Sequence, residues 1–356
     1  MSCIGIVATD DAVSTARYFE DAAVADGHEV IKLSGRTAPP AEGLDVLLAI
    51  DPFVMAPAKL LQARCPVAAY AIDAHQQLAH RLAYAKYADH VFVAQPEYLP
   101  HFVAIPHPSA HWLPLACDPG VHFTPGLERT IDVGFVGKLG QPGSDRHTTL
   151  TRVLSAFATN DWGRRYTPRE MGEVYSRSKI VFNRSINRDL NMRFFEGLAA
   201  GALLVTDSIG NGLDRIGRPG EHYVVYDTVE EAIEQVRYYL VHDDERERIA
   251  RAGQQLVLGE HTYRHRLRQI LDAVARHPDA RAPARTASPG VEALWRSEHM
   301  RILGTAASSG LKLLAQGHLS RPVVANVAVG MARGIVRPLR LRLQDLSRRR
   351  NGKPLT

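Results

Sequence analysis

The sequence predicts an α/β protein with two successive domains, each built on a parallel sheet that is covered by helices. Short apolar runs alternate with helical patterns over residues 1–100, and the connections between them are short. A proline-rich stretch interrupts this alternation, which restarts near residue 131. A chain of 356 residues also exceeds one ordinary hydrophobic core, so two domains are expected.

The first domain is expected over residues 1–105. Its strands are expected at residues 3–8, 29–33, 45–50, 67–72 and 90–94, and its helices at 16–24, 57–64 and 80–88. Ligands of such sheets bind at the carboxyl ends of the strands. The polar residues at these ends are Thr9, Asp10, Asp51, Asp73, His75 and Gln95.

The second domain is expected over residues 127–277, after a connector at 106–126 that contains five prolines. Its strands are expected at 131–136, 178–183, 202–206 and 222–226, and its helices at 146–158, 169–176, 228–242, 245–258 and 263–275. Between two of these strands, the stretch 191–207 indicates a short helix with a face of small residues. Gly201 is expected to end this helix, and the buried strand that follows ends at Thr206 and Asp207.

Residues 278–356 are expected to form a basic tail that is helical or partly disordered. The tail holds 14 Lys and Arg against 4 Asp and Glu, a net charge of +10, whereas residues 1–277 have a net charge of −5. One interpretation is a solvated tail, which Gly334 and Pro338 favour because they interrupt the helical pattern. The other is a basic amphipathic segment that lies on an anionic membrane surface.

Composition argues against several classes of protein. The folded body is mildly acidic, so a nucleic-acid partner is not expected. The three cysteines are widely spaced and match neither a metal site nor a disulfide framework. The amino-terminal residues enter a strand pattern directly, and no apolar run is long enough to span a bilayer. These features predict a cytoplasmic protein, which the basic tail would place at the inner face of the membrane in the second interpretation.

Three segments resemble the GT-B glycosyltransferases, in particular the group of family-four-type and CgeB-like enzymes. They are residues 112–119, residues 132–138 and, as the most specific, residues 193–207 with the sequence RFFEGLAAGALLVTD. The resemblance covers roughly residues 100–275. It implies two Rossmann-like domains that face a cleft, with the donor on the second domain and the acceptor mostly on the first.

The resemblance implies a donor site in the second domain. Glu196 matches the glutamate that accepts hydrogen bonds from the ribose hydroxyls. Lys138 and Arg146 match basic diphosphate contacts, beside Gly137 and a helix start that Ser144 or Asp145 can cap. Arg193 is a third cation, and Asn183, Asn191 and Thr206 complete the expected donor-binding set. No cofactor and no metal are expected, and a UDP-sugar is the expected donor.

The candidate catalytic residues are His75, Asp73 and Asp10, all at strand ends of the first domain. In a retaining enzyme, which the resemblance favours, His75 would hydrogen-bond to the donor sugar. In an inverting enzyme, one of the three would act as the general base. The sequence departs from the group at Arg188, where a glutamate often contacts the donor sugar. Asn187 or Asp189 can substitute for it, or Arg188 can itself suit an anionic sugar.

These features predict sugar transfer from a nucleotide-diphosphate sugar to an envelope glycan, a lipid-linked glycan or a small natural product. A Rossmann dehydrogenase is disfavoured because Gly134, Gly137 and Gly140 have the wrong spacing for a dinucleotide fingerprint. A nucleotide-sugar 2-epimerase of the same fold and a non-catalytic interaction protein remain as alternatives. Glu196, Lys138 and Arg146 argue against the latter.

Overall fold

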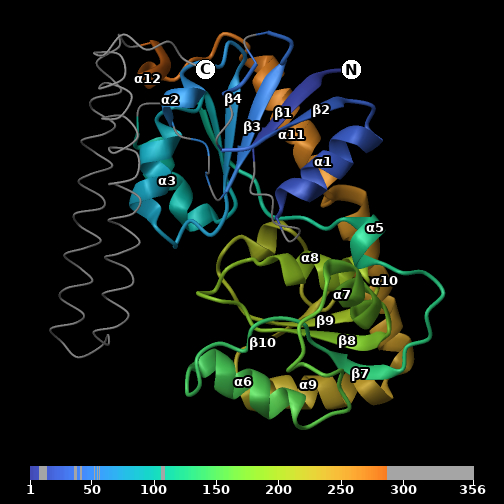
Figure 1. Ribbon diagram of the computed structural model, residues 1–356. Helices are drawn as coiled ribbons and strands as arrows, with labels where there is room; N and C mark the ends of the chain where they lie inside the picture. The colour runs from blue at the N-terminus through green and yellow to red at the C-terminus, as the bar shows by residue number, and fades with distance from the viewer. Residues whose placement is uncertain are drawn as a thin grey trace, which may run out of the picture. The chain divides into compact units, whose positions relative to one another are not determined.

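The computed structural model describes residues 1–7, 14–35, 38–40, 42–51, 53, 55, 57–105 and 109–286 (Figure 1). Residues 1–286 form one compact unit with two parallel sheets. The candidate residue Asp10 and the predicted basic tail from residue 287 onward lie outside the described residues.

The first sheet has six parallel strands in the order β2-β1-β3-β4-β5-β6. Helices α1 and α11 cover one face of it, and α3 lies on the other (Figure 1). The strands are β1 (Cys3–Val7), β2 (Glu29–Leu33), β3 (Val46–Ile50), β4 (Val67–Ala71), β5 (His90–Val93) and β6 (Ser109–Trp112). The helices of residues 1–122 are α1 (Ala16–Ala25), α2 (Pro57–Leu60), α3 (Leu78–Ala85), α4 (Leu99–Val103) and α5 (Pro119–His122).

Strands β3 and β4 are apolar and buried along their whole length, as expected for a parallel sheet that is covered on both faces. Their register places Ile50 opposite Tyr70, so the two strands end at the same edge of the sheet. The polar residues that follow them, Asp51 and Asp73 among them, therefore emerge together at the carboxyl edge.

The second sheet has four parallel strands in the order β10-β9-β8-β7. Helices α6 and α9 lie on one face, and α7, α8 and α10 on the other (Figure 1). The strands are β7 (Ile131–Gly134), β8 (Ser178–Asn183), β9 (Leu203–Asp207) and β10 (Val224–Tyr226). The helices that follow β7 are α6 (Asp145–Leu154), α7 (Pro168–Ser176), α8 (Met192–Ala199), α9 (Val229–Val241), α10 (Asp243–Glu260), α11 (Tyr263–Arg276) and α12 (Pro283–Thr286).

The stretch predicted as the connector contains β6, which pairs in parallel with β5. Leu113 N donates to Val93 O and the Trp112 indole donates to Ala94 O, so this short segment extends the first sheet despite its prolines. Helix α11, predicted in the second domain, packs against α1 of the first. The chain therefore crosses between the two sheets more than once.

The start of the predicted tail is anchored to the first sheet. Asp89, which is fully buried, accepts hydrogen bonds from Val67 N at 2.8 Å and Ala282 N at 2.7 Å. Its carboxylate also pairs with Arg285, and the Arg285 guanidinium donates to Cys65 O at 3.1 Å. Residues 282–285 are therefore part of the folded unit.

Candidate functional site

The start of α8 is tied to the end of β8 by side-chain hydrogen bonds. Asn191 caps the helix by accepting from Phe194 N at 3.2 Å. Its amide donates to Asn183 Oδ1 at 3.1 Å, and Arg193 Nη1 donates to the same oxygen at 3.0 Å. Asn183 in turn donates to Thr206 Oγ1 at 3.0 Å. Asn183 and Thr206 are therefore interior residues that hold Asn191 and Arg193 in place.

Arg193 lies across the loop that follows β7. Its Nη2 donates to Val136 O at 2.8 Å, and its Nε donates to Tyr175 Oη at 3.2 Å. Gly137 has φ +149°, and a Cβ atom there would clash with Arg193 Nη2. A side chain at residue 137 would therefore displace the guanidinium as well as strain the backbone.

Arg146 is positioned by the first turn of α6, which Ser144 caps by accepting from His147 N. Its Nε and Nη2 donate to Lys138 O at 3.2 and 2.9 Å. Its Nη1 is buried and has no hydrogen-bond partner among the described residues. Burial and the nearby Arg193 lower the pKa of Arg146 to about 10, which leaves it charged at neutral pH. A charged donor without a partner is the expected state of an anion site before its ligand binds.

Glu196 lies in the fifth position of α8 and is only 6% exposed. Burial raises its pKa to about 7, although Arg193 acts in the opposite direction. The Nε2 atom of His122 lies 3.7 Å from Glu196 Oε1. Burial lowers the pKa of His122 to about 3, so this contact is not an ion pair at neutral pH. The described residues thus leave Glu196 as a buried carboxyl with unused capacity to accept hydrogen bonds.

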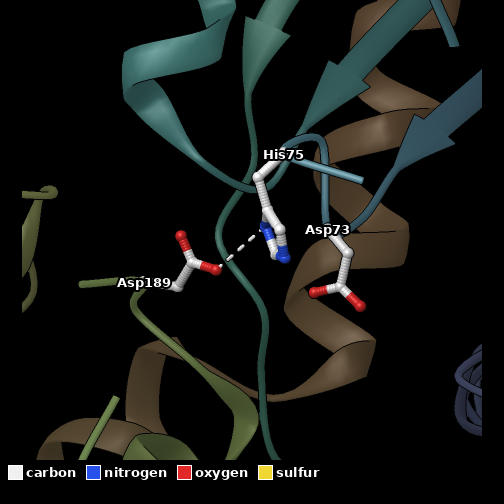
Figure 2. A group of neighbouring side chains, drawn as sticks. All are labelled: Asp73, His75 and Asp189. Atoms are coloured by element: carbon white, nitrogen blue, oxygen red, sulfur yellow. Dashed lines mark ion pairs between the residues drawn. The ribbon is translucent and has the colours of Figure 1, made fainter. Parts of the chain in front are cut away.

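Figure 2 shows a second cluster, in which His75 lies between Asp73 and Asp189. His75 Nδ1 lies 3.1 Å from Asp189 Oδ2, although the alignment is not that of a hydrogen bond. One ligand atom of each side chain lies within 4.8 Å of the other two. Burial, with help from Glu97 and Asp73, raises the pKa of Asp189 to about 7.

The loop that carries Asp73 and His75 is held by other strand-end residues. Gln95 Oε1 accepts from Ala74 N at 3.1 Å. Arg81 donates to Ile72 O at 3.1 Å and pairs with Asp51, whose pKa burial raises to about 6. Asp51 and Gln95, both predicted at strand ends, therefore help to position the loop that carries Asp73 and His75.

The Asp73, His75 and Asp189 cluster and the group formed by Lys138, Arg146, Arg193 and Glu196 line one cavity of about 420 Å³. Eight of the predicted site residues line it, namely Asp73, His75, Gly137, Lys138, Arg146, Asn191, Arg193 and Glu196. Asn183 and Thr206 lie behind its wall. Asp189, weighed only as a substitute for the residue before it, also lines the cavity, as do apolar side chains such as Ile186 and Met192. Asp189 could have been identified because it lies seven residues before Glu196. The glutamate that often contacts the donor sugar in the GT-B group lies eight residues before the equivalent position.

Comparisons with known proteins agree with this architecture. The family model described as "Glycosyl transferase-like" matches residues 133–272, which include the end of β7, the loop between β7 and α6, and α8. A sequence search against curated proteins finds no match. Among the described residues, none of the helices combines the length and the apolar character that crossing a bilayer requires.

Several solved structures are similar to the chain in fold. Sucrose-phosphate synthase from Thermosynechococcus elongatus aligns with a TM-score of 0.54 at 12% identity, covering 78% of this chain and 99% of that one. HepE from Anabaena, solved in complex with UDP-glucose, aligns with a TM-score of 0.57 at 10% identity, covering 78% and 100%. A glycosyltransferase from Rickettsia africae aligns with a TM-score of 0.55 at 11% identity, covering 77% and 98%. The predicted fold class is thereby confirmed, because two parallel α/β sheets arranged as in these proteins form the GT-B fold.

Proposed function

We propose that the chain is a glycosyltransferase that moves a sugar from a nucleotide-diphosphate sugar, with UDP as the nucleotide, to an acceptor hydroxyl. The observation that carries this proposal is the unpartnered Arg146 Nη1, which lines the same cavity as the buried carboxyl of Glu196. A cation and a hydrogen-bond acceptor on neighbouring elements suit a ligand with a diphosphate next to a ribose. HepE, of similar fold, was solved with UDP-glucose bound.

In the proposed mechanism the second sheet binds the donor. Lys138 and Arg146 contact the diphosphate and stabilise the negative charge that grows on it as the bond to the sugar breaks. Arg193 is held by Val136, Tyr175 and Asn183, so it acts as a fixed positive charge beside them. Glu196 accepts hydrogen bonds from the ribose hydroxyls in its ionised form.

The proposed role of His75 and Asp73 depends on the stereochemical course. With retention, which the resemblance implies, His75 contacts the donor sugar. With inversion, His75 or Asp73 takes the proton of the acceptor hydroxyl. The anomeric configuration of the product, read by NMR, distinguishes the two courses. Envelope glycans, lipid-linked glycans and small natural products are the acceptor classes to assay.

Residues 193–207 support placing the chain in the family-four-type and CgeB-like group of GT-B proteins. The basic side chains around the cavity support catalysis without a metal ion. Asp73, His75 and Asp189 are close enough together to bind one, so the point needs a test. We expect hydrolysis of UDP-glucose by the purified protein to proceed unchanged in EDTA. A loss of turnover that Mg²⁺ or Mn²⁺ restores would contradict this.

Calorimetric titration with UDP, GDP and dTDP tests the proposal most directly. At least one should bind more tightly than about 1 mM, which corresponds to about −4 kcal/mol. Arg146→Ala should weaken that binding by about 1.5–3 kcal/mol, because a charge-assisted contact is lost. Arg152→Ala is the matched control: Arg152 lies on the same helix but pairs with Glu230 away from the cavity. The proposal is wrong if none of the nucleotides binds.

A nucleotide-sugar 2-epimerase is the second candidate. It needs several acid and base groups around the sugar, and Asp73, His75 and Asp189 provide such a cluster. Such an enzyme would convert UDP-N-acetylglucosamine to its epimer without an acceptor. NMR of the incubated nucleotide sugar separates the two functions, because transfer and hydrolysis change the anomeric linkage and epimerisation leaves it in place.

A further inference from the structure

The cavity has opposite charges at its two clusters. Lys138, Arg146 and Arg193 supply positive charge on one side, from the loop after β7 and the starts of α6 and α8. Asp73, His75 and Asp189 form the other cluster, shown in Figure 2. A nucleotide sugar has the same polarity, because its diphosphate is anionic and its sugar usually is not. With the diphosphate at the basic side, the sugar meets the acidic cluster.

The acidic cluster holds more carboxyl groups than imidazoles. Asp189 is 5% exposed, and among the described residues it forms an ion pair with His75 alone. Its Oδ1 is buried and has no hydrogen-bond partner among those residues. Glu97 and Asp73 both act on Asp189 as like charges. Two carboxyl groups, those of Asp73 and Asp189, therefore lie beside one imidazole.

Arg188 does not offset this charge. Asn187 and Arg188 have φ +53° and +58°, a left-handed turn that reverses the chain just before Asp189. The Arg188 side chain is exposed, and its Nη2 donates to Ser208 O at 3.3 Å. Arg188 is not among the residues that line the cavity, whereas Asp189 is. Arg188, which could have bound an anionic sugar, thus lies outside the cavity, and the carboxyl of Asp189 lines the cavity instead.

We propose that the sugar subsite accepts uncharged sugars and amino sugars and discriminates against uronic acids, with Asp73 and Asp189 as the residues that determine this specificity. The inference rests on the proposed function, since it assumes that a nucleotide sugar occupies the cavity. A uronic acid would bring its carboxylate against like charges in a partly desolvated site, where their repulsion is stronger than in water. The same charges attract the ammonium of an amino sugar.

Calorimetry at pH 8 with the full chain tests the specificity. We expect UDP-glucuronate to bind about tenfold more weakly than UDP-glucose, and UDP-glucosamine to bind at least as tightly as UDP-glucose. Equal or tighter binding of UDP-glucuronate would overturn the inference while leaving the proposed function intact. A protein that binds no UDP at all contradicts the proposed function, and the inference falls with it.

Two variants and one control assign the specificity to residues. Asp73→Asn and Asp189→Asn should each reduce the preference for UDP-glucose over UDP-glucuronate, with UDP affinity unchanged as evidence of folding. Asn tolerates the left-handed φ of +49° at residue 73, so Asp73→Asn adds no backbone strain. Arg188→Gln is the matched control and should leave the preference as it was. A preference that neither Asn variant alters, or that Arg188→Gln alters instead, would show that the assignment is wrong.

Discussion

At the scale of single residues, the cavity contains two carboxyl groups whose pKa is raised to about 7, those of Glu196 and Asp189. Burial is the main cause for both. Raised pKa values are common at functional sites, where burial and neighbouring charges shift the pKa of the groups that contact ligands. Both side chains are therefore expected to be only partly ionised at neutral pH.

The raised pKa of Glu196 predicts a pH-dependent cost to the fold. Because its pKa is higher in the folded than in the unfolded state, its stabilising contribution is complete below about pH 4.5 and is lost as the pH rises through 7. We expect Glu196→Gln to raise the free energy of unfolding by about 2–3 kcal/mol at pH 8 and by much less at pH 5. Urea denaturation at the two pH values measures this. A difference that does not change with pH would contradict it.

The same substitution should weaken the binding of UDP. The ionised carboxylate is the better acceptor for ribose hydroxyls, so UDP affinity of the wild-type protein should rise between pH 6 and pH 8. Glu196→Gln should bind UDP about 1.5–3 kcal/mol more weakly at pH 8. The ratio of the two affinities is the quantity to follow, because the phosphate itself titrates near pH 6 and affects both proteins equally. A ratio that is constant from pH 6 to pH 8 would remove Glu196 from the site.

Some of these residues could be identified from sequence alone, and others could not. Lys138, Arg146 and Glu196 were proposed from the resemblance to GT-B glycosyltransferases. The matching segments are local, a glycine-rich loop and two helix starts, and such segments depend little on the rest of the fold. The position of Asp189 depends on the left-handed turn at residues 187 and 188. Non-glycine residues rarely adopt that conformation, so the turn is not expected from the sequence. Counting eight residues back from Glu196 therefore selects Arg188.

At the scale of elements, the loop between β7 and α6 is shaped by glycines with positive φ. Gly137, Gly140 and Gly143 all have such a conformation. A Cβ atom at Gly137 would meet the Arg193 guanidinium, and one at Gly140 would meet the Ser144 hydroxyl. Gly137→Ala should therefore lower stability and UDP affinity together, since it displaces a cation of the cavity. Gly143→Ala is the matched control, because it strains the backbone but meets no atom within 4 Å.

The outcome is decided by UDP calorimetry and thermal denaturation of the two glycine variants. We expect a backbone cost of about 1 kcal/mol in both, and a loss of UDP affinity in Gly137→Ala alone. Equal effects of the two substitutions on affinity would show that contact with Arg193 is unimportant.

Most of the strands were predicted within one or two residues, since buried parallel strands are continuous apolar runs. Strand β6 was missed because it follows Pro106 and Pro108 and is only half-buried along its length. Nothing in its own sequence shows that a neighbouring strand, β5, offers it an unpaired edge. Pairing of that kind is a property of the sheet and is not visible in a short segment.

At the scale of the whole molecule, the folded unit extends beyond the predicted domain. Residues 282–285 lie on the first sheet through the buried pair of Arg285 and Asp89. We expect Arg285→Ala to lower the free energy of unfolding by about 3–5 kcal/mol, because Asp89 would keep a buried charge without its partner. Arg281→Ala is the control, since among the described residues its guanidinium donates hydrogen bonds to carbonyls of its own segment and not to Asp89.

Truncation provides a second measurement of the same anchor. A chain ending at residue 286 should retain UDP binding and stability, whereas one ending at residue 277 should lose stability by a similar amount to Arg285→Ala. Thermal denaturation of the two truncated chains compares them directly. Equal stability would contradict a structural role for residues 278–286. The anchor was not predictable because a Pro-, Ala- and Arg-rich segment has no periodicity that distinguishes it from a linker.

The anchor at Asp89 also bears on how the protein is made. Asp89 lies 193 residues before Ala282, which supplies one of its hydrogen bonds, and helix α11 reaches the first sheet only after the second has been synthesised. On the ribosome, domains generally fold as units from the amino terminus. The carboxylate of Asp89 therefore lacks its ion-pair partner until Arg285 has been synthesised. The nascent amino-terminal half is therefore expected to depend on chaperones for longer than its sequence order suggests.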